Sequence, residues 1–105
     1  LNAVKKNGMI IWYIKNPSEK IQLAAVRKNA NSILYIKNPS EKIQLAAVSK
    51  MPEVIVDLCN PSTKVRQKAI QLKPDVILQM DDVTLKEKEL ATKLDPQLLH
   101  KVFAL

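Results

Sequence analysis

The stretch Tyr13-Ile-Lys-Asn-Pro-Ser-Glu-Lys-Ile-Gln-Leu-Ala-Ala-Val26 decides the fold, because the same fourteen residues return unchanged from Tyr35 to Val48. The two copies start 22 residues apart. A third, altered copy runs from Leu58 to Ile70, and a fainter fourth copy contains Asp82-Val83-Thr84. A strict short period of this kind is the signature of a protein built from stacked repeats.

Composition narrows the class of fold. The chain has 105 residues, the size of one domain, and its 47% hydrophobic content is enough for a core. Aromatic residues make up only 4% of the sequence, and Gly8 is its single glycine. These values argue against a β-sandwich and against a glycine-rich nucleotide loop, so helix is favoured.

Cysteine usage and hydropathy indicate the setting of the protein. Cys59 is the only cysteine and cannot form an internal disulfide bond, so nothing in the sequence indicates an oxidising compartment. The longest apolar run, Met9 to Ile14, has six residues, far fewer than the roughly 18 needed to span a bilayer. With no visible signal peptide, we expect an intracellular, cytoplasmic protein without a membrane partner.

Positions that are 22 residues apart, here called columns, show which residue types the copies share. Because Ile21 and Ala25 are four residues apart, they lie on one helical face. We expect the alanine column to be core, where a helix lies too close to its neighbour for a larger side chain. The two most apolar columns are Ala3, Ala25, Ala47, Ala69 and Ala91, and then Val4, Val26, Val48, Ile70 and Thr92.

Each long helix has a predicted start. Asn16 can accept a hydrogen bond from first-turn amides, Pro17 suits the first helical position, and Glu19 lies three residues after the cap. The predicted N-caps are Asn16, Asn38, Asn60 and Asp82. The predicted helices span residues 17–28, 39–50, 61–72 and 83–94, with residues 1–6 as the tail of an earlier one.

A second, shorter segment follows each long helix. Its first column consists of Gly8, Ala30, Pro52, Pro74 and Pro96. Proline at the first position of a short helix, after a residue held outside the helical region, explains this column. Apolar residues spaced by three, such as Ile33 and Ile36 with Leu34 between them, predict two turns of α or 3₁₀ helix with most of the circumference buried. A buried strand is the alternative, because isoleucine, valine and tyrosine favour strands.

These segments together predict an all-α protein, an α-solenoid of about five 22-residue two-helix repeats around one continuous core. The expected repeats are a partial copy at 1–15, then 16–37, 38–59, 60–81 and 82–105. Because Leu1 to Asn7 matches Leu23 to Asn29 in register, we expect a fragment of a longer array. Glu87 and Glu89 occupy apolar columns, so the last repeat is interpreted as a degenerate cap, with a functional face as the alternative.

An Asn-Pro-Ser turn followed by Glu-Lys-Ile-Gln-Leu-Ala-Ala-Val, as between Asn38 and Val48, resembles the short α-helical repeats of the leucine-rich repeat variant and HEAT-like groups. The near-identical copies look most like the NPSE-type repeat arrays of bacteria, phages and large viruses. This resemblance covers essentially the whole chain, but its motifs specify packing rather than chemistry. It implies a binding scaffold, in a cell or as a component of a phage or virus particle.

Basic residues outnumber acidic ones by 17 to 10, which gives a net charge of +7 and a pI near 9.6. In a solenoid, a column becomes a stripe with steps of roughly 10 Å, which could follow phosphates or an acidic partner. A solvated face that serves solubility is the alternative, because Glu19 and Glu41 adjoin the first two lysines. The candidate stripe comes from two columns: Lys20, Lys42, Lys64 and Lys86, and then Arg66 and Lys88, which follow Gln22 and Gln44.

No motif in the sequence predicts catalysis. Some HEAT-like proteins of bacteria remove alkylated bases, which needs an acidic residue and aromatic walls, and Asp57 with Trp12 is the sole candidate pair. His100 has no partner at a motif spacing and Cys59 has no second metal ligand, so we expect both to have structural roles. The adjacent Asp81-Asp82 is favoured as a helix junction over a metal site. We therefore expect no enzymatic activity, no cofactor and no metal.

The two ends of the chain are apolar. Val4, Ile11 and Trp12 would lie on a side that an earlier repeat covers, and the last four residues are apolar throughout. Uncovered repeat ends tend to find partners, so we expect a protein partner or self-association through the ends. The leading hypothesis is a non-enzymatic scaffold for protein–protein interaction or assembly. The alternative is an electrostatic nucleic-acid-binding module that uses the lysine columns, and a rigid spacer is a third reading.

Overall fold

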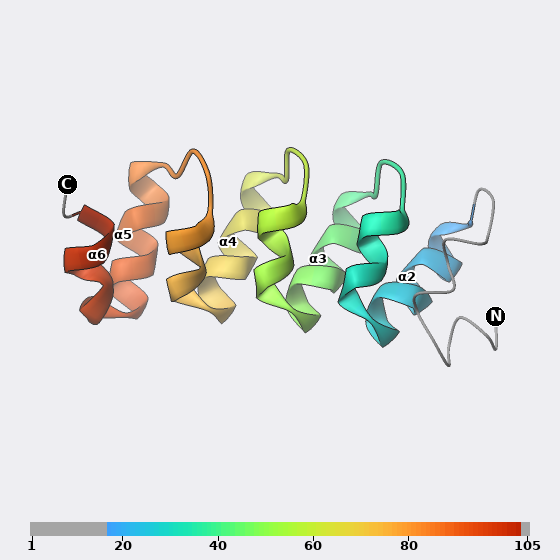
Figure 1. Cartoon of the computed structure of the whole chain (residues 1–105), viewed down its shortest axis with the longest axis horizontal. Helices are drawn as coiled ribbons and strands as arrows, with labels where there is room; N and C mark the ends of the chain where they lie inside the picture. The colour runs from blue at the N-terminus through green and yellow to red at the C-terminus, as the bar shows by residue number, and fades with distance from the viewer. Residues whose placement is uncertain (1–16, 104–105) are drawn as a thin grey trace.

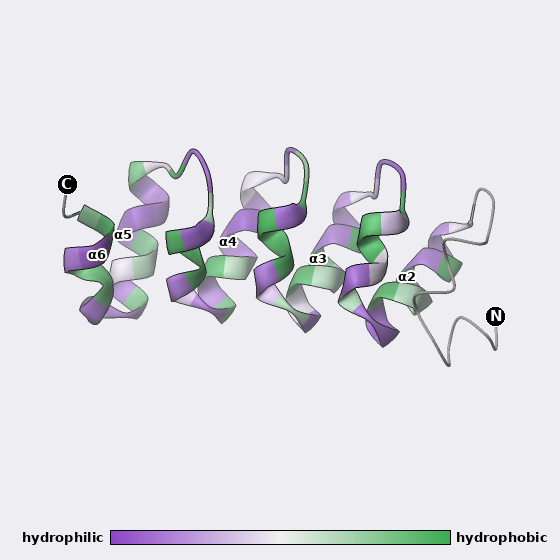
Figure 2. Ribbon diagram, viewed as in Figure 1, coloured by the Kyte–Doolittle hydropathy of each residue, from purple (hydrophilic) through white to green (hydrophobic). Residues whose placement is uncertain are grey.

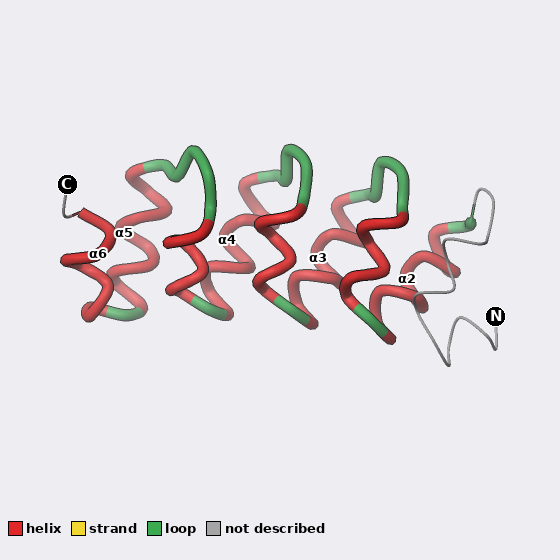
Figure 3. The backbone as a smooth tube through the Cα atoms, viewed as in Figure 1, coloured by secondary structure: helices red, strands yellow, loops and turns green. Residues whose placement is uncertain are grey.

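The computed structural model describes residues 17–103, and every regular element in that range is a helix (Figures 1 and 3). The predicted all-α class is confirmed, and the strand alternative for the short segments is wrong within this range. Four ten-residue α-helices alternate with short 3₁₀ helices, here labelled η, and a five-residue α-helix ends the described range. The elements are α2 (Glu19–Lys28), η2 (Ala30–Tyr35), α3 (Glu41–Lys50), η3 (Pro52–Asp57), α4 (Thr63–Leu72), η4 (Pro74–Gln79), α5 (Leu85–Leu94), η5 (Pro96–Leu98) and α6 (Leu99–Phe103).

Each α-helix and the short helix after it form one helix pair. The α-helices begin at Glu19, Glu41, Thr63 and Leu85, so successive pairs begin 22 residues apart. The expected tail at 1–6, the short segment after Gly8 and the cap at Asn16 lie outside the described residues.

The pairs pack in order along the chain and make two layers. The α-helices contact one another consecutively from α2 to α5, and η2, η3 and η4 do the same in the second layer. Each of η2, η3 and η4 also contacts the α-helix of its own pair and that of the next pair. The molecule is elongated, 47 × 21 × 18 Å, and the 3₁₀ layer is the one nearer the viewer in Figure 1.

The predicted N-caps are wrong at Asn38, Asn60 and Asp82, because each α-helix begins two residues later than expected. The observed N-caps are Ser18, Ser40, Ser62 and Thr84. The Ser40 Oγ, for example, accepts a hydrogen bond from the Ile43 amide at 3.3 Å. The prolines of the Asn-Pro-Ser turns therefore precede the helices instead of opening them.

Asn38, Asn60 and Asp82 have a backbone role instead. Their φ angles are 54°, 52° and 51°, in the left-handed region, where each turn connects a 3₁₀ helix to the next α-helix. Asn and Asp enter this region more readily than other residues with a Cβ atom. The same residue types are also favoured at N-caps, so composition alone could not separate the two roles.

The core follows the predicted columns. The alanine column is fully buried at the four described positions, and so is the valine and isoleucine column after it up to the third pair. In the short helices, Ile33, Ile55 and Ile77 are buried, with 2–4% exposure. The fully buried side chains of the two α-helical columns are Ala25, Ala47, Ala69, Ala91, Val26, Val48 and Ile70.

The prediction that most of the circumference of the short helices is buried fails at one column. The column between the buried isoleucines consists of Leu34, Val56 and Leu78, with 51%, 46% and 46% exposure. A 3₁₀ helix has three residues per turn, so neighbours along the chain point about 120° apart. The α layer covers one side of the 3₁₀ layer, and this column lies on the other.

Candidate interaction surfaces

The first basic column projects from the outer side of the α layer. Lys20, Lys42, Lys64 and Lys86 take the second position of α2, α3, α4 and α5, and all four are exposed. The buried seventh position of each helix and the buried eighth position of α2, α3 and α4 point the other way, because successive residues rotate by about 100°. The four lysines therefore repeat from helix to helix on the side away from the core.

The sixth and ninth positions of each α-helix lie on the same side as the second, within about 40° of it. Together these positions hold seven basic residues and no acidic residue, and only Lys68 among the seven is half-buried. We call this set the basic face. It consists of Lys20, Ala24, Arg27, Lys42, Ala46, Ser49, Lys64, Lys68, Gln71, Lys86, Leu90 and Lys93.

The second column of the candidate stripe makes contacts inside the chain. The Nε2 atoms of Gln22 and Gln44 each donate a hydrogen bond to the carbonyl of the proline five residues earlier, at 3.0 Å. The Lys88 Nζ lies over the Phe103 ring, 5.9 Å from its centroid. Arg66 is held by an ion pair. Of the six candidate stripe residues, Arg66 and Lys88 are thus engaged within the fold.

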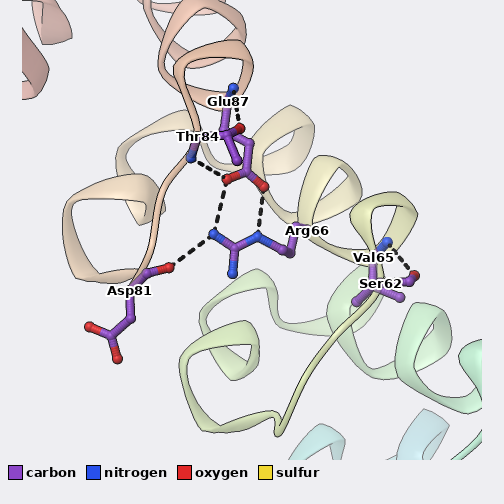
Figure 4. A network of polar contacts seen from close by, with 6 residues as sticks. All are labelled: Ser62, Val65, Arg66, Asp81, Thr84 and Glu87. Atoms are coloured by element: carbon purple, nitrogen blue, oxygen red, sulfur yellow. Dashed lines mark hydrogen bonds and ion pairs between the residues drawn. The ribbon is translucent and has the colours of Figure 1, made fainter.

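Arg66 links two successive helix pairs (Figure 4). Its Nε and Nη2 donate to the Glu87 carboxylate at 2.6 and 3.0 Å, and Nη2 also donates to the Asp81 carbonyl at 3.0 Å. Glu87 and Thr84 form a capping box, in which the Glu87 carboxylate accepts from the Thr84 amide at 3.0 Å and the Thr84 hydroxyl accepts from the Glu87 amide at 3.2 Å.

The ion pair is largely buried, with 18% of the Arg66 side chain and 5% of the Glu87 side chain exposed. The hydrogen bond from the guanidinium lowers the pKa of Glu87 below its ordinary value, more strongly than burial raises it. The same bond raises the pKa of Arg66. Glu87, which the sequence pattern placed in an apolar column, is therefore a buried carboxylate with its own cation.

Polar bonds also cross the earlier junctions, by which we mean the contacts between one helix pair and the next. The Ser40 hydroxyl donates to Glu19 at 2.8 Å, and the Ser62 hydroxyl donates to Glu41 at 2.7 Å. At the next junction Thr63 replaces the glutamate, and the Arg66 pair supplies the polar link instead.

A row of apolar side chains lies on the exposed side of the 3₁₀ layer. Leu34, Val56 and Leu78 occupy equivalent positions in η2, η3 and η4, and we call them the apolar row. Figure 2 shows hydrophobic segments on the 3₁₀ helices of the layer nearer the viewer. Sequence reasoning missed this surface, because it assigned the column to the core.

Two clefts open beside the apolar row. Leu34 lines one of about 470 Å³, together with Ile36, Leu58 and Gln44, whose Oε1 is buried without a hydrogen-bond partner. Leu78 lines a smaller cleft of about 180 Å³ toward the C-terminal end. The row therefore borders concave surface with both apolar walls and a buried acceptor.

Charge is divided between the long helices and the rest of the described residues. Helices α2 to α5 contain eleven basic and four acidic residues, a net charge of +7. The rest of residues 17–103 carries a net charge of −3. It holds three basic residues, Lys37, Lys73 and Lys101, and six acidic ones, Glu53, Asp57, Asp75, Asp81, Asp82 and Asp95.

The remaining candidate residues do not assemble into a site. Cys59 is exposed, and so is His100, so the packing role expected for the histidine is wrong. Trp12 lies outside the described residues, and with it the candidate pair of Trp12 and Asp57. Between residues 17 and 103, no three His, Cys, Asp or Glu side chains group so that they could hold a metal ion.

Comparison with known proteins found no match: no protein-family model, no curated protein and no solved structure is similar to this chain. In the described part of the chain, no helix has both the length and the apolar character needed to cross a membrane.

Proposed function

We propose that this chain is an α-solenoid scaffold that binds another protein through its 3₁₀ layer. The solenoid would comprise about five 22-residue two-helix repeats, as the sequence period predicts. The consecutive packing of the helix pairs, their spacing of 22 residues and the columns buried from pair to pair support this arrangement. The resemblance to NPSE-type and HEAT-like arrays supports a binding role for such a scaffold.

The apolar row is the observation that carries the proposal. Leu34, Val56 and Leu78 are each about half exposed, so their side chains are not needed to fill the core. The position is nevertheless aliphatic in three consecutive 3₁₀ helices. Single exposed leucines are common, but an aligned row beside clefts is typical of an interaction site. About half of each side chain is already buried, so covering the exposed half with a partner would contribute on the order of 1 kcal/mol of binding free energy per side chain.

The partner is expected to present apolar side chains along an extended edge or helix. One such side chain would enter the cleft beside Leu34, where the unpartnered Oε1 of Gln44 could accept a hydrogen bond from a partner N–H. The acidic character of this layer favours a partner with basic residues around its apolar anchors.

The last helix pair is proposed to cap the solenoid. Thr92 stands in the column of Val26, Val48 and Ile70, and its hydroxyl donates to the Lys88 and Glu89 carbonyls of its own helix at 2.9 and 3.2 Å. Its polar group therefore needs no contact from a following repeat, which suits a terminal position.

The test compares two variants that each remove two exposed leucines. Leu34→Ser with Leu78→Ser removes the ends of the apolar row, whereas Leu72→Ser with Leu94→Ser removes leucines of 47% exposure from the ends of the long helices. Proteins retained by the wild-type chain are identified, purified and titrated against both variants. The row variant is expected to weaken binding by roughly 30-fold, which corresponds to about 2 kcal/mol, and the control variant by less than about threefold.

Equal loss of binding in both variants would contradict the assignment to the 3₁₀ layer. Retention of no protein by micromolar wild-type chain, together with a monomer in sedimentation, would contradict the binding role itself. A self-associated chain that becomes monomeric in the row variant alone would support the row with a second copy as its partner.

A further inference from the structure

We propose that the basic face binds the phosphate backbone of a nucleic acid. This surface belongs to the outer side of α2 to α5, whereas the apolar row belongs to the 3₁₀ layer. The two proposals are therefore independent, and the molecule would be able to hold a protein on one side and a polyanion on the other.

The spacing of the lysines suits a linear polyanion. Neighbouring packed helices lie about 8–10 Å apart, so Lys20, Lys42, Lys64 and Lys86 span about 24–30 Å. One strand of a duplex presents a phosphate about every 3.4 Å along the axis, so roughly eight phosphates of each strand lie within this length, and the row faces those on the near side of the duplex. Lysine side chains are long and flexible enough to select one phosphate each.

The distribution of charge argues against a purely solubilising role. Surfaces that serve solubility intersperse both signs of charge, but the basic face has seven cations and no carboxylate. The acidic residues of the long helices are used or placed elsewhere. Glu19 and Glu41 accept hydrogen bonds from serines at the junctions, and Glu87 is buried against Arg66. Glu89, at the fifth position of α5, lies about 60° around the helix from Lys86, at the edge of the face.

The rest of residues 17–103 reinforces this division, because its net charge is −3. A chain with both layers equally basic would attract anions from all sides. Here the field is directed to one side, which orients an approaching polyanion toward the α layer.

The composition of the basic face favours nucleic acid over an acidic protein. Protein partners are held mainly by aromatic, arginine or aliphatic anchors in the centre of an interface. The apolar members of the basic face are Ala24, Ala46 and Leu90, all half-buried, so they offer little uncovered apolar area. Binding to phosphates needs no such anchors, since it depends on cations and on the release of counterions.

The experiment measures binding of labelled DNA and RNA duplexes of about 20 base pairs between about 50 and 200 mM salt. Two variants that remove two positive charges each are compared with the wild-type chain. Lys42→Gln with Lys64→Gln changes the basic face, and Lys37→Gln with Lys101→Gln changes exposed lysines outside it. Circular dichroism checks that both variants unfold at the wild-type temperature.

The expected result is a salt slope that becomes shallower by about 2 in the basic-face variant, because each lysine–phosphate contact contributes about 0.9. The control variant is expected to change the slope by less than about 0.5. Equal changes in both variants would mean that only net charge matters, and would overturn the proposal.

Absence of binding at about 50 mM salt would also overturn the proposal. Two further probes separate the classes of polyanion. Binding to polyglutamate or to phosphatidylserine vesicles that equals or exceeds binding to the duplexes, with the same dependence on Lys42 and Lys64, would assign the face to an acidic protein or a membrane and would reject nucleic acid.

Discussion

Replacing Arg66 by Gln should destabilise the chain, and replacing Glu87 by Val in the same molecule should restore most of the lost stability. The chain itself suggests this pair of changes, because Gln44 and Val65 occupy the same two positions at the preceding junction. The double variant thus copies a junction that the protein already contains.

The size of each effect follows from burial and hydrogen bonding. Arg66→Gln leaves the Glu87 carboxylate, 5% exposed, with only the Thr84 amide as a partner, and should cost about 3 kcal/mol. Glu87→Val leaves a guanidinium that is 18% exposed and still bonded to the Asp81 carbonyl, and should cost about 1.5 kcal/mol. The double variant loses only the carboxylate half of the capping box, worth about 1 kcal/mol. The coupling energy, which is the sum of the two single costs minus the cost of the double variant, is therefore about 3.5 kcal/mol.

Urea unfolding followed by far-ultraviolet circular dichroism at neutral pH measures these free energies, provided that all four proteins share one m-value. The ion pair between Lys73 and Glu53 serves as the control. Its Nζ and Oε2 atoms are 3.0 Å apart, and the two side chains are 43% and 44% exposed. The cycle of Lys73→Gln and Glu53→Val should give a coupling below about 1 kcal/mol. If the Arg66 and Glu87 variants add within about 0.5 kcal/mol, the reasoning from burial is refuted.

Three further predictions concern pH, turns and packing. Because the pKa of Glu87 is lowered in the folded chain, its ionised carboxylate stabilises the fold at pH values above the ordinary pKa of 4.5, and this stabilisation is lost as the pH falls through the lower folded pKa. The urea midpoint should therefore drop on acidification, and it should drop less in the double variant. Asn38→Ala should cost about 1 kcal/mol in thermal unfolding because its φ is 54°, whereas Asn38→Gly should change stability by less than about 0.5 kcal/mol. Ala47→Leu should cost about 1–3 kcal/mol by overpacking a fully buried site, but Ser49→Leu, at an exposed position of the same helix, should cost less than about 0.5 kcal/mol, as chemical unfolding can show.

The period of 22 residues was sufficient to predict the order and kind of the helices. Identical side chains in consecutive copies indicate equivalent surroundings. A column that is alanine in every copy indicates that neighbouring helix backbones lie too close together for a larger side chain. Ala47 and Ala69 are accordingly fully buried. The prolines at Pro52 and Pro74 marked the short helices correctly, because a residue before proline leaves the helical region.

The period could not show which side of a short helix faces the core. Ile33, Leu34 and Tyr35 are all apolar enough to be buried, and three consecutive positions of a 3₁₀ helix cover its whole circumference. Only the position of the α layer decides that Ile33 is buried and that Leu34 and Tyr35 are about half exposed. The candidate protein-binding row was therefore invisible before the layers were known.

Helix geometry separates the roles of the basic residues, including Arg66, which breaks the pattern of its column. Lys64 and Arg66 are two residues apart, so they point about 200° apart on α4, and grouping them in one stripe was inconsistent with a helix. Arg66 faces the junction, where a cation can persist only beside an acceptor. The acceptor, Glu87, is also a departure from its column, 21 residues later, the same separation that joins Glu19 to Ser40 and Glu41 to Ser62. Two charged residues that break the pattern of their columns and lie 21 residues apart thus predict an ion pair between successive helix pairs. The lysines that recur in every copy are, in contrast, the ones whose side chains remain available to solvent or a ligand.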